Sequence, residues 1–335
     1  MGKVVTLGEI MLRFSTQAGN RFVQSDSLQA HYGGGEANVG ISLANYGHEV
    51  VFASKVPDTT LGEAVRQHLW KYHVDTRYLL AGGKRLGTYY LETGIGERSA
   101  SVIYDRAGSS FAEMEGLEWD LATLFNDVDI FHISGITPAL SKSWQTMTLE
   151  LIKQARKFGC KVSFDINYRS KLWSQKEAGQ TIRQLLPYVD YCSAGKLDAV
   201  NLLGIANEPD DEEHEVAFYY EKMQKLFPNI QLFYSTKRTV HSASANQLIG
   251  TLWHNQQYYE SAIHEIDPIV DRVGAGDAFA GGILHGMLEK MQPQAIVDFA
   301  TAAAALKHTV YGDCNQFSKE EVADFLTCGS GKIMR

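Results

Sequence analysis

The sequence is poor in cysteine, in proline and in long apolar runs. Its four cysteines, Cys160, Cys192, Cys314 and Cys328, lie far apart, with no C-x-x-C pair and no adjacent histidine at zinc-finger spacing, which excludes a small disulfide scaffold. No stretch approaches the roughly 20 apolar residues that a membrane span requires. The first residues, MGKVVTLGEIMLRF, are interrupted by Glu9 and make a poor signal peptide. We therefore expect a reduced, cytoplasmic protein.

Positive charge is also scarce. Lys and Arg total 31 against 39 Asp and Glu, which gives a formal net charge of -8. This balance argues against nucleic acid or an anionic membrane as a partner, but it allows a local basic pocket that binds a small anion. Hydrophobic residues make up 44% of the 335 residues, and no low-complexity linker divides them. We expect one folded domain over residues 1–335.

Short β-rich runs alternate with longer helical patterns along the chain. This rhythm is typical of βαβ units and predicts an α/β fold around a largely parallel sheet. The expected strands are Lys3–Leu7, Val50–Ser54, Ile130–Ser134, Lys161–Phe164, Tyr188–Cys192 and Leu232–Ser235. The expected helices are Ala37–Tyr46, Leu61–Lys71, Lys142–Phe158, Glu177–Leu186, Ala217–Leu226 and Asp277–Glu289. The acidic stretch Glu208–Glu215 is predicted to be a solvated helix start rather than a cation site.

Two segments interrupt this rhythm, Leu12–Tyr32 and Arg85–Tyr104. The second contains GTYYLETG and ASVIYD, whose alternation and aromatic residues are typical of half-exposed strands. The two segments are far apart in sequence, but they could pair in space. We expect a small β-strand lid within about residues 12–35 and 85–110, because long insertions into an α/β core are often functional. The alternative is an edge extension without a function.

The segment Asp271–Gly282, DRVGAGDAFAGG, has the clearest local chemistry. Glycines on both sides of Ala275 allow a tight turn that presents unobstructed N–H groups at a helix N-terminus, where an anion is favoured. Gly274, Ala275 and Gly276 are therefore a candidate anion hole, and Asp277 would point its carboxylate toward the anion. The alternative is an ordinary helix start in which Asp277 is only a favourable first-turn charge.

Two further segments have the character of a site. In Gly33–Asn38, GGGEAN, three glycines permit close approach of the backbone to a ligand. In Asp165–Arg169, DINYR, polar residues follow an expected strand, and open α/β sheets bind ligands at the carboxyl ends of their strands. Other templates are absent from the sequence: GxxxxGK[ST], GxGxxG after a strand, HExxH and GxSxG.

Together these motifs resemble the PfkB (ribokinase-like) family of carbohydrate kinases. The resemblance follows the family's order over almost the whole chain and rests on GGGEANV, RLGTYYLE, YDRAGS, ISGITPALS, DINYRSKLW and DRVGAGDAFAGG. It implies a ribokinase-like fold, with a mostly parallel central sheet flanked by helices and a small β-strand lid. The motifs are most similar to members that use ATP and Mg²⁺ to phosphorylate the terminal (6-) hydroxyl of the sugar acid 2-keto-3-deoxygluconate. A fructokinase or other sugar kinase, and a sugar-acid-binding regulator on an inactive kinase fold, are the alternatives.

The resemblance also implies roles for single residues. It makes Gly274, Ala275 and Gly276 the anion hole for the transferred phosphoryl group, with Asp277 as catalytic base. The implied substrate contacts are Gly34, Tyr89, Tyr104, Arg106, Arg169, Asp277 and Asp313. Ser193 and Thr236 are implied on the nucleotide side, together with the Gly274–Gly276 turn.

The sequence departs from the family's pattern around the nucleotide. An N-x-x-E arrangement is replaced by Gly195–Asp198, GKLD, and the expected glycine-containing loop reads STKRTVHSAS, without glycine. Pro57 stands where many members have glycine. The metal ligands are therefore left unassigned.

Three expectations follow from these residues. Arg106 and Arg169 bind the substrate carboxylate, since guanidinium groups match carboxylates bidentately. The lid strands of two subunits pack together in a homodimer or higher homo-oligomer, because one face of the lid needs cover. The helix N-terminus keeps the pKa of Asp277 low.

Overall fold

The computed structural model describes residues 1–206 and 215–328. Its main sheet has the order β13-β12-β11-β10-β9-β8-β1-β4-β5, with β14 paired to β12. The strands are β1 (Lys3–Leu7), β4 (Glu49–Val56), β5 (Leu79–Ala81), β8 (Ile130–Ser134), β9 (Lys161–Asp165), β10 (Tyr191–Ser193), β11 (Leu232–Val240), β12 (Asn246–His254), β13 (Gln257–Glu260) and β14 (His264–Ile266). All pairings from β5 to β11 are parallel, whereas β12 is antiparallel to β11, β13 and β14.

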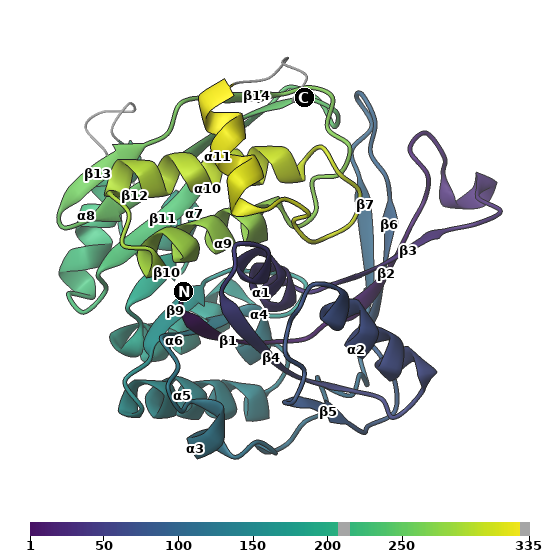
Figure 1. The fold of residues 1–335 in the computed structure, drawn as a ribbon, viewed down its shortest axis with the longest axis horizontal. Helices are drawn as coiled ribbons and strands as arrows, with labels where there is room; N and C mark the ends of the chain where they lie inside the picture. The colour runs from purple at the N-terminus through teal and green to yellow at the C-terminus, as the bar shows by residue number, and fades with distance from the viewer. Residues whose placement is uncertain (207–214, 329–335) are drawn as a thin grey trace.

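Helices cover both faces of this sheet (Figure 1). Strand β1 shows how, because Val5 and Leu7 belong to the apolar core on one face and Val4 to the core on the other, as the two-residue period of a strand requires. The first core contains residues of α5 (Lys142–Lys157), α6 (Gln175–Leu185) and α8 (Glu215–Leu226). The second contains residues of α1 (Gly35–Asn45), α2 (Thr60–Lys71), α9 (Ala275–Leu288) and α10 (Pro293–Lys307). Shorter helices are α3 (Leu121–Leu124), α4 (Ile136–Ala139), α7 (Lys196–Asn201) and α11 (Lys319–Cys328), with 3₁₀ turns at Phe22–Gln24 and Leu186–Tyr188.

A second sheet forms the expected lid. It has the order β3-β2-β6-β7 and comprises β2 (Met11–Ser15), β3 (Gln29–Gly33), β6 (Thr88–Glu92) and β7 (Ser101–Asp105). The two interrupting segments do pair in space, through parallel strands β2 and β6. In Figure 1 this sheet stands to one side of the helical body. The α/β prediction is confirmed, and so is the expected pairing of the two segments in one small sheet.

Most expected elements agree with the structure to within a few residues, and one strand needs correction. Residues 186–188 form a 3₁₀ turn, so β10 begins at Tyr191 rather than at Tyr188. Pro187 lies at the start of this turn, where its fixed φ and missing N–H are tolerated, and the turn includes Tyr188. Of the acidic stretch, residues 208–214 lie outside the described part of the chain, and Glu215 is the first residue of α8.

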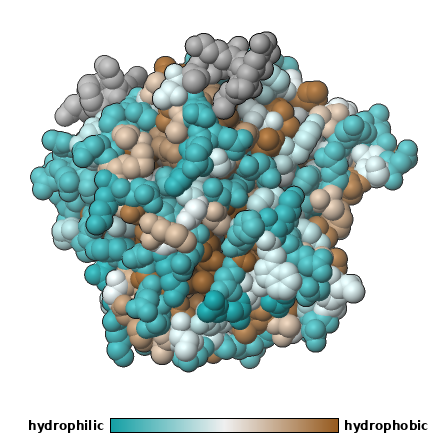
Figure 2. Space-filling view, viewed as in Figure 1, coloured by the Kyte–Doolittle hydropathy of each residue, from teal (hydrophilic) through white to brown (hydrophobic). Residues whose placement is uncertain are grey.

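The surface of the molecule matches the composition. The face seen in Figure 2 is largely hydrophilic, with apolar side chains gathered in small patches. Cys160, Cys192 and Cys314 are buried free thiols. Within the described ranges, none of the helices combines the length and the apolarity of a membrane span.

Candidate active site

A cavity of about 490 Å³ lies between the lid and the ends of the core strands. Its wall combines residues from the lid, from the loops after β3 and β9, and from the start of α9. The expected site residues that line it are Gly34, Tyr89, Tyr104, Arg106, Arg169, Gly274, Gly276, Asp277 and Asp313. Ala275 is buried beneath this wall, and Ser193 and Thr236 are not among the residues of the wall. The structure thus brings together expected site residues up to 279 positions apart in sequence, from Gly34 to Asp313.

The candidate anion hole has the predicted backbone geometry. Gly274 precedes the first residue of α9 and has a φ of 81°, in the left-handed region that favours glycine. A Cβ atom on Gly274 would lie 1.6 Å from the carbonyl oxygen of Asp313, so this position excludes every side chain. A Cβ atom on Gly276 would meet nothing within 4 Å. Among the first-turn amides, that of Ala275 donates to the carbonyl oxygen of Arg272 at 3.4 Å, and the others, which have no helical acceptor, are left for an anion in the cavity.

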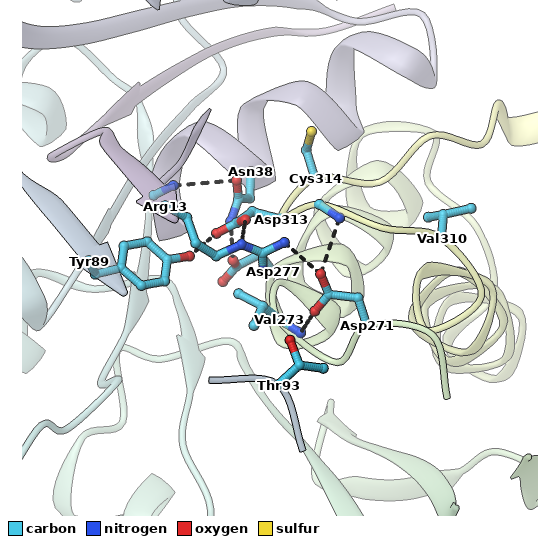
Figure 3. A network of polar contacts seen from close by, with 12 residues as sticks. Arg13, Asn38, Tyr89, Thr93, Asp271, Val273, Asp277, Val310, Asp313 and Cys314 are labelled. Carbon is cyan, nitrogen blue, oxygen red and sulfur yellow. Dashed lines mark hydrogen bonds and ion pairs between the residues drawn. The ribbon is translucent and has the colours of Figure 1, made fainter. Parts of the chain in front are cut away.

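Asp277 lies in the first turn of α9 and contacts the first turn of α1. The Nδ2 atom of Asn38 donates a hydrogen bond of 2.7 Å to its Oδ2 atom (Figure 3). Burial raises the pKa of Asp277 to about 7, and the hydrogen bond from Asn38 opposes the rise only in part. The nearby Asp165 raises it further, and Arg169 lowers it. Our expectation of a low pKa is therefore wrong, because desolvation outweighs the helix N-terminus.

Behind the anion hole is a buried cluster of charges (Figure 3). Arg13, on lid strand β2, is 1% exposed; its Nη2 atom donates to Asp271 Oδ2 at 2.6 Å, and its Nε atom lies 3.2 Å from Asp313 Oδ1. The ammonium of Lys307, which is fully buried at the end of α10, donates to the carbonyl oxygens of Asp271 and Val310. Two cations and two carboxylates thus share one desolvated space.

This cluster holds the loops that form the site. Asp271 accepts hydrogen bonds from the backbone N–H groups of Val273, at 3.0 Å, and Gly312, at 3.1 Å. The Tyr89 hydroxyl of the lid donates to Asp313. Asp313, which the resemblance assigns to substrate hydroxyls, is therefore already bound to Arg13 and Tyr89. These buried charged groups hold the lid, the anion hole and the Asp313 loop together.

The two arginines expected to bind a carboxylate differ in their surroundings. Arg106 forms an ion pair with Glu9, which is 4% exposed and also accepts a hydrogen bond from the Ser109 hydroxyl. Arg169 follows β9 and is exposed to the cavity, and among the described residues it makes no ion pair or side-chain hydrogen bond. Arg169 therefore offers a guanidinium without an ion-pair partner, whereas Arg106 would have to leave Glu9 before it could bind a substrate carboxylate.

A second group of carboxylates lies at the ends of β9 and β10. Burial raises the pKa of Asp165 to about 6, against a hydrogen bond with Ser193 that lowers it. Burial likewise raises the pKa of Asp198 to about 6; this residue accepts a hydrogen bond of 2.9 Å from the N–H of Gly195 at the start of α7. Thr236 lies on β11 opposite Gly250. Ser193 thus contacts the acidic group behind the cavity.

Sequence reasoning missed several residues that build the site. Glu9 and Arg13 lie in MGKVVTLGEIMLRF, where their only signal is a charged residue within an apolar segment. Lys307 follows the alanine-rich run ATAAAAL, and a lysine in so apolar a helix is a comparable signal. Glu9 and Arg13 form ion pairs with residues distant in sequence, and Lys307 contacts the distant Asp271 as well as the nearby Val310, so their roles depend on tertiary structure.

Comparisons with known proteins agree with this geometry. The model of the pfkB family carbohydrate kinases matches residues 1–320. A crystal structure of a PfkB family carbohydrate kinase from Listeria grayi is 47% identical, with a TM-score of 0.94, over 97% of this chain and 99% of that one. The crystal structure of a 2-dehydro-3-deoxygluconokinase from Thermotoga maritima is 39% identical, with a TM-score of 0.94, over 98% and 100% of the two chains. A 2-dehydro-3-deoxygalactonokinase from Haloferax volcanii is 32% identical over 99% of both chains.

Proposed function

Because this chain belongs to the pfkB family of carbohydrate kinases, we propose that it transfers the γ-phosphoryl group of ATP to the terminal 6-hydroxyl of 2-keto-3-deoxygluconate. The product is 2-keto-3-deoxy-6-phosphogluconate. The observation that carries the proposal is one cavity that holds an anion hole, Asp277 and the unpaired Arg169. A sugar acid can place its carboxylate on Arg169 and its far hydroxyl beside Asp277.

The chemistry follows from the positions of these groups. The hydroxyl oxygen attacks the γ-phosphorus, the bond from that phosphorus to the ADP oxygen breaks, and the hydroxyl proton passes to Asp277. A base with a pKa near the working pH combines adequate basicity with a large ionised fraction. The pKa of about 7 for Asp277 meets this condition. The amides of the Gly274–Gly276 turn stabilise the charge on the transferred group.

Substrate identity is proposed from charge and from the relatives. Arg169 has no ion-pair partner among the described residues, so its guanidinium can bind a substrate carboxylate bidentately, which favours an acid over a neutral sugar. We propose that Arg106 contributes by leaving Glu9 for the substrate. Similar proteins are named for the gluconate and the galactonate forms of the acid. The C4 epimer 2-keto-3-deoxygalactonate is therefore a second candidate.

The residues present fit a magnesium ion. Mg²⁺ usually keeps several waters and binds through one or two carboxylates and the substrate phosphates. Asp165 lines the cavity, and Asp198 raises its pKa from behind, so a divalent cation would relieve their repulsion. When bound, the ion neutralises charge on the phosphates. We assign Asp165 as its main protein ligand, with Ser193 holding that carboxylate in place.

We further propose that the chain acts as a dimer in the cytoplasm. On the outer face of the lid, Phe14, Tyr90 and Ile103 lie in register on adjacent strands. The rings of Phe14 and Tyr90 stack at 5.6 Å, and Ile103 is 54% exposed. A second lid can cover this apolar stripe with its own. The three buried thiols suit a reducing compartment.

An ADP-release assay over a panel of substrates tests the function. We expect turnover with 2-keto-3-deoxygluconate, with or without its C4 epimer, and little with fructose or ribose. Faster turnover of a neutral sugar would refute the choice of substrate. Binding of the sugar acid in calorimetry without any ADP release would instead indicate a regulator on an inactive kinase fold.

A further inference from the structure

Two arginines outside the roles discussed so far line the active-site cavity. Arg238 lies in the second half of β11, and Arg272 lies in the loop that leads to α9, two residues before Gly274. They come from separate elements and meet at one side of the cavity. The same wall contains Gly274 and Gly276 of the anion hole.

Neither guanidinium is neutralised within the described part of the chain. Two other cations near the site have acidic partners: Arg106 pairs with Glu9, and Lys237, next to Arg238, pairs with Glu260 at 2.5 Å. No ion pair or hydrogen bond of the described residues involves the side chain of Arg238 or Arg272, and the Nη2 atom of Arg272 is buried without a partner.

The two charges also act on each other. Desolvation lowers the pKa of Arg238, and the positive charge of Arg272 lowers it further. Two like charges held close together in a partly desolvated wall are unfavourable unless an anion lies between them. The chain has a net charge of -8, yet residues 1–206 and 215–328 supply no carboxylate to either guanidinium. This arrangement is typical of a binding site in which a ligand supplies the anionic group.

The position of the pair identifies that anion. Arg169, which faces the sugar acid in the proposed function, interacts with Asp165 and Asp277. Arg272 instead adjoins the anion hole, where the transferred phosphoryl group must lie. The segment Ser235–Ser244, STKRTVHSAS, continues past Arg238 without a glycine, so close backbone approach to a phosphate chain is restricted there. Side-chain cations are the alternative means of binding it, and guanidinium forks match phosphate oxygens.

We propose that Arg238 and Arg272 form a clamp for the polyphosphate chain of the nucleotide, in place of a glycine-rich backbone cradle. The assignment of a nucleotide rests on the proposed kinase function. The clamp binds the phosphates of the nucleotide, and not its base or the sugar acid. Affinity should therefore increase with the number of phosphates, from adenosine through ADP to ATP, and should weaken at high ionic strength.

The test compares Arg238→Gln and Arg272→Gln with Lys237→Gln, a neighbouring charge that Glu260 already neutralises. We expect each arginine variant to raise the KM for ATP ten- to a hundredfold and to leave the KM for the sugar acid within about twofold, whereas Lys237→Gln changes neither. Arg272→Lys should recover part of the loss. Inorganic tripolyphosphate should compete with ATP in the wild type and lose that inhibition in both glutamine variants.

Calorimetry separates this clamp from the choice of sugar. Binding of ADP and of tripolyphosphate requires no turnover, so weaker binding in the glutamine variants supports the clamp even if no panel sugar is phosphorylated. An unchanged affinity for both probes overturns the clamp. A rise in the KM for the sugar acid alone also overturns it, because the arginines would then bind the substrate carboxylate.

Discussion

Replacing Asp277 with asparagine should make the protein more stable and less active, with both effects dependent on pH. The pKa of Asp277 is about 7 in the fold against 3.8 for the free group. Between these values the unfolded chain ionises this carboxyl while the folded chain keeps it protonated, so stability falls as pH rises from about 4 to 7. The amide of the Asp277→Asn variant carries no such penalty, and its side-chain oxygen can still accept the hydrogen bond from Asn38.

The shift sets the size of the effect. Three pKa units correspond to about 4 kcal/mol once the pH exceeds both values. Assays at pH 5 and pH 8 differ by the part of this shift that lies between pH 5 and pH 7. Cavity water screens some of that part, so the stabilisation by asparagine should differ by about 1–3 kcal/mol between the two pH values. For 335 residues the entropy of unfolding is about 0.7 kcal/mol/K. The Tm of the asparagine variant minus that of the wild type should therefore be about 1.5–4 °C larger at pH 8 than at pH 5.

Thermal unfolding and steady-state kinetics measure the two effects together. Turnover should fall by about 10²–10⁴, because the base is lost, while ATP and sugar-acid binding change little. In the wild type kcat should decline below about pH 7 as Asp277 is protonated. Asp324→Asn, at an exposed residue of α11, is the control and should change neither property. A Tm difference that is the same at both pH values would refute the burial argument, and near-native turnover would refute the role as base.

Further predictions concern the arginine, the loops and the lid. Arg169→Lys should raise the KM for the sugar acid at least tenfold and leave any neutral-sugar turnover unchanged; equal losses on both in kinetic assays would contradict its assignment. Lys307→Met should cost about 3 kcal/mol in urea unfolding, because it leaves buried carboxylates with one cation, and a loss below about 1 kcal/mol would contradict this. Gly274→Ala should abolish kcat in a less stable protein, since its Cβ would overlap the Asp313 carbonyl. Light scattering at micromolar concentration should give a dimer, and the polar change Ile103→Asp should give monomers.

The elements that sequence could predict are those with a local signature. Strand Ile130–Ser134, IFHIS, is a short β-rich run and agrees with β8 residue for residue. Helix α10 was absent from the expectations, because it is buried on nearly every side and lacks the polar face by which an amphipathic helix is recognised. The antiparallel strands β12–β14 follow β11 at the sheet edge, and their pairing depends on neighbours that the sequence pattern does not specify.

The site residues likewise divide into those with a local sequence signature and those without one. The Gly274–Gly276 turn and Asp277 were identifiable because turn, amides and carboxylate are contiguous in sequence. The pKa of Asp277 was not, since the groups that desolvate it come from other elements. The hydrogen bond between Arg13 and Asp271 spans 258 positions, and no periodicity connects residues so distant. The charge and chemical type of these residues could be predicted from the local sequence, whereas their burial depends on the tertiary fold.

The buried cluster of Arg13, Lys307, Asp271 and Asp313 has a consequence for how this sequence can diverge. Its two positive and two negative charges sum to zero, so the cluster adds no net charge beside the phosphoryl-binding loop. Changing one member would leave an uncompensated charge in the interior, next to that loop. We therefore expect the four positions to change together rather than singly. A lineage that loses Lys307 should tend to lose a carboxylate with it, or to acquire another cation in its place, because the single loss destabilises the fold.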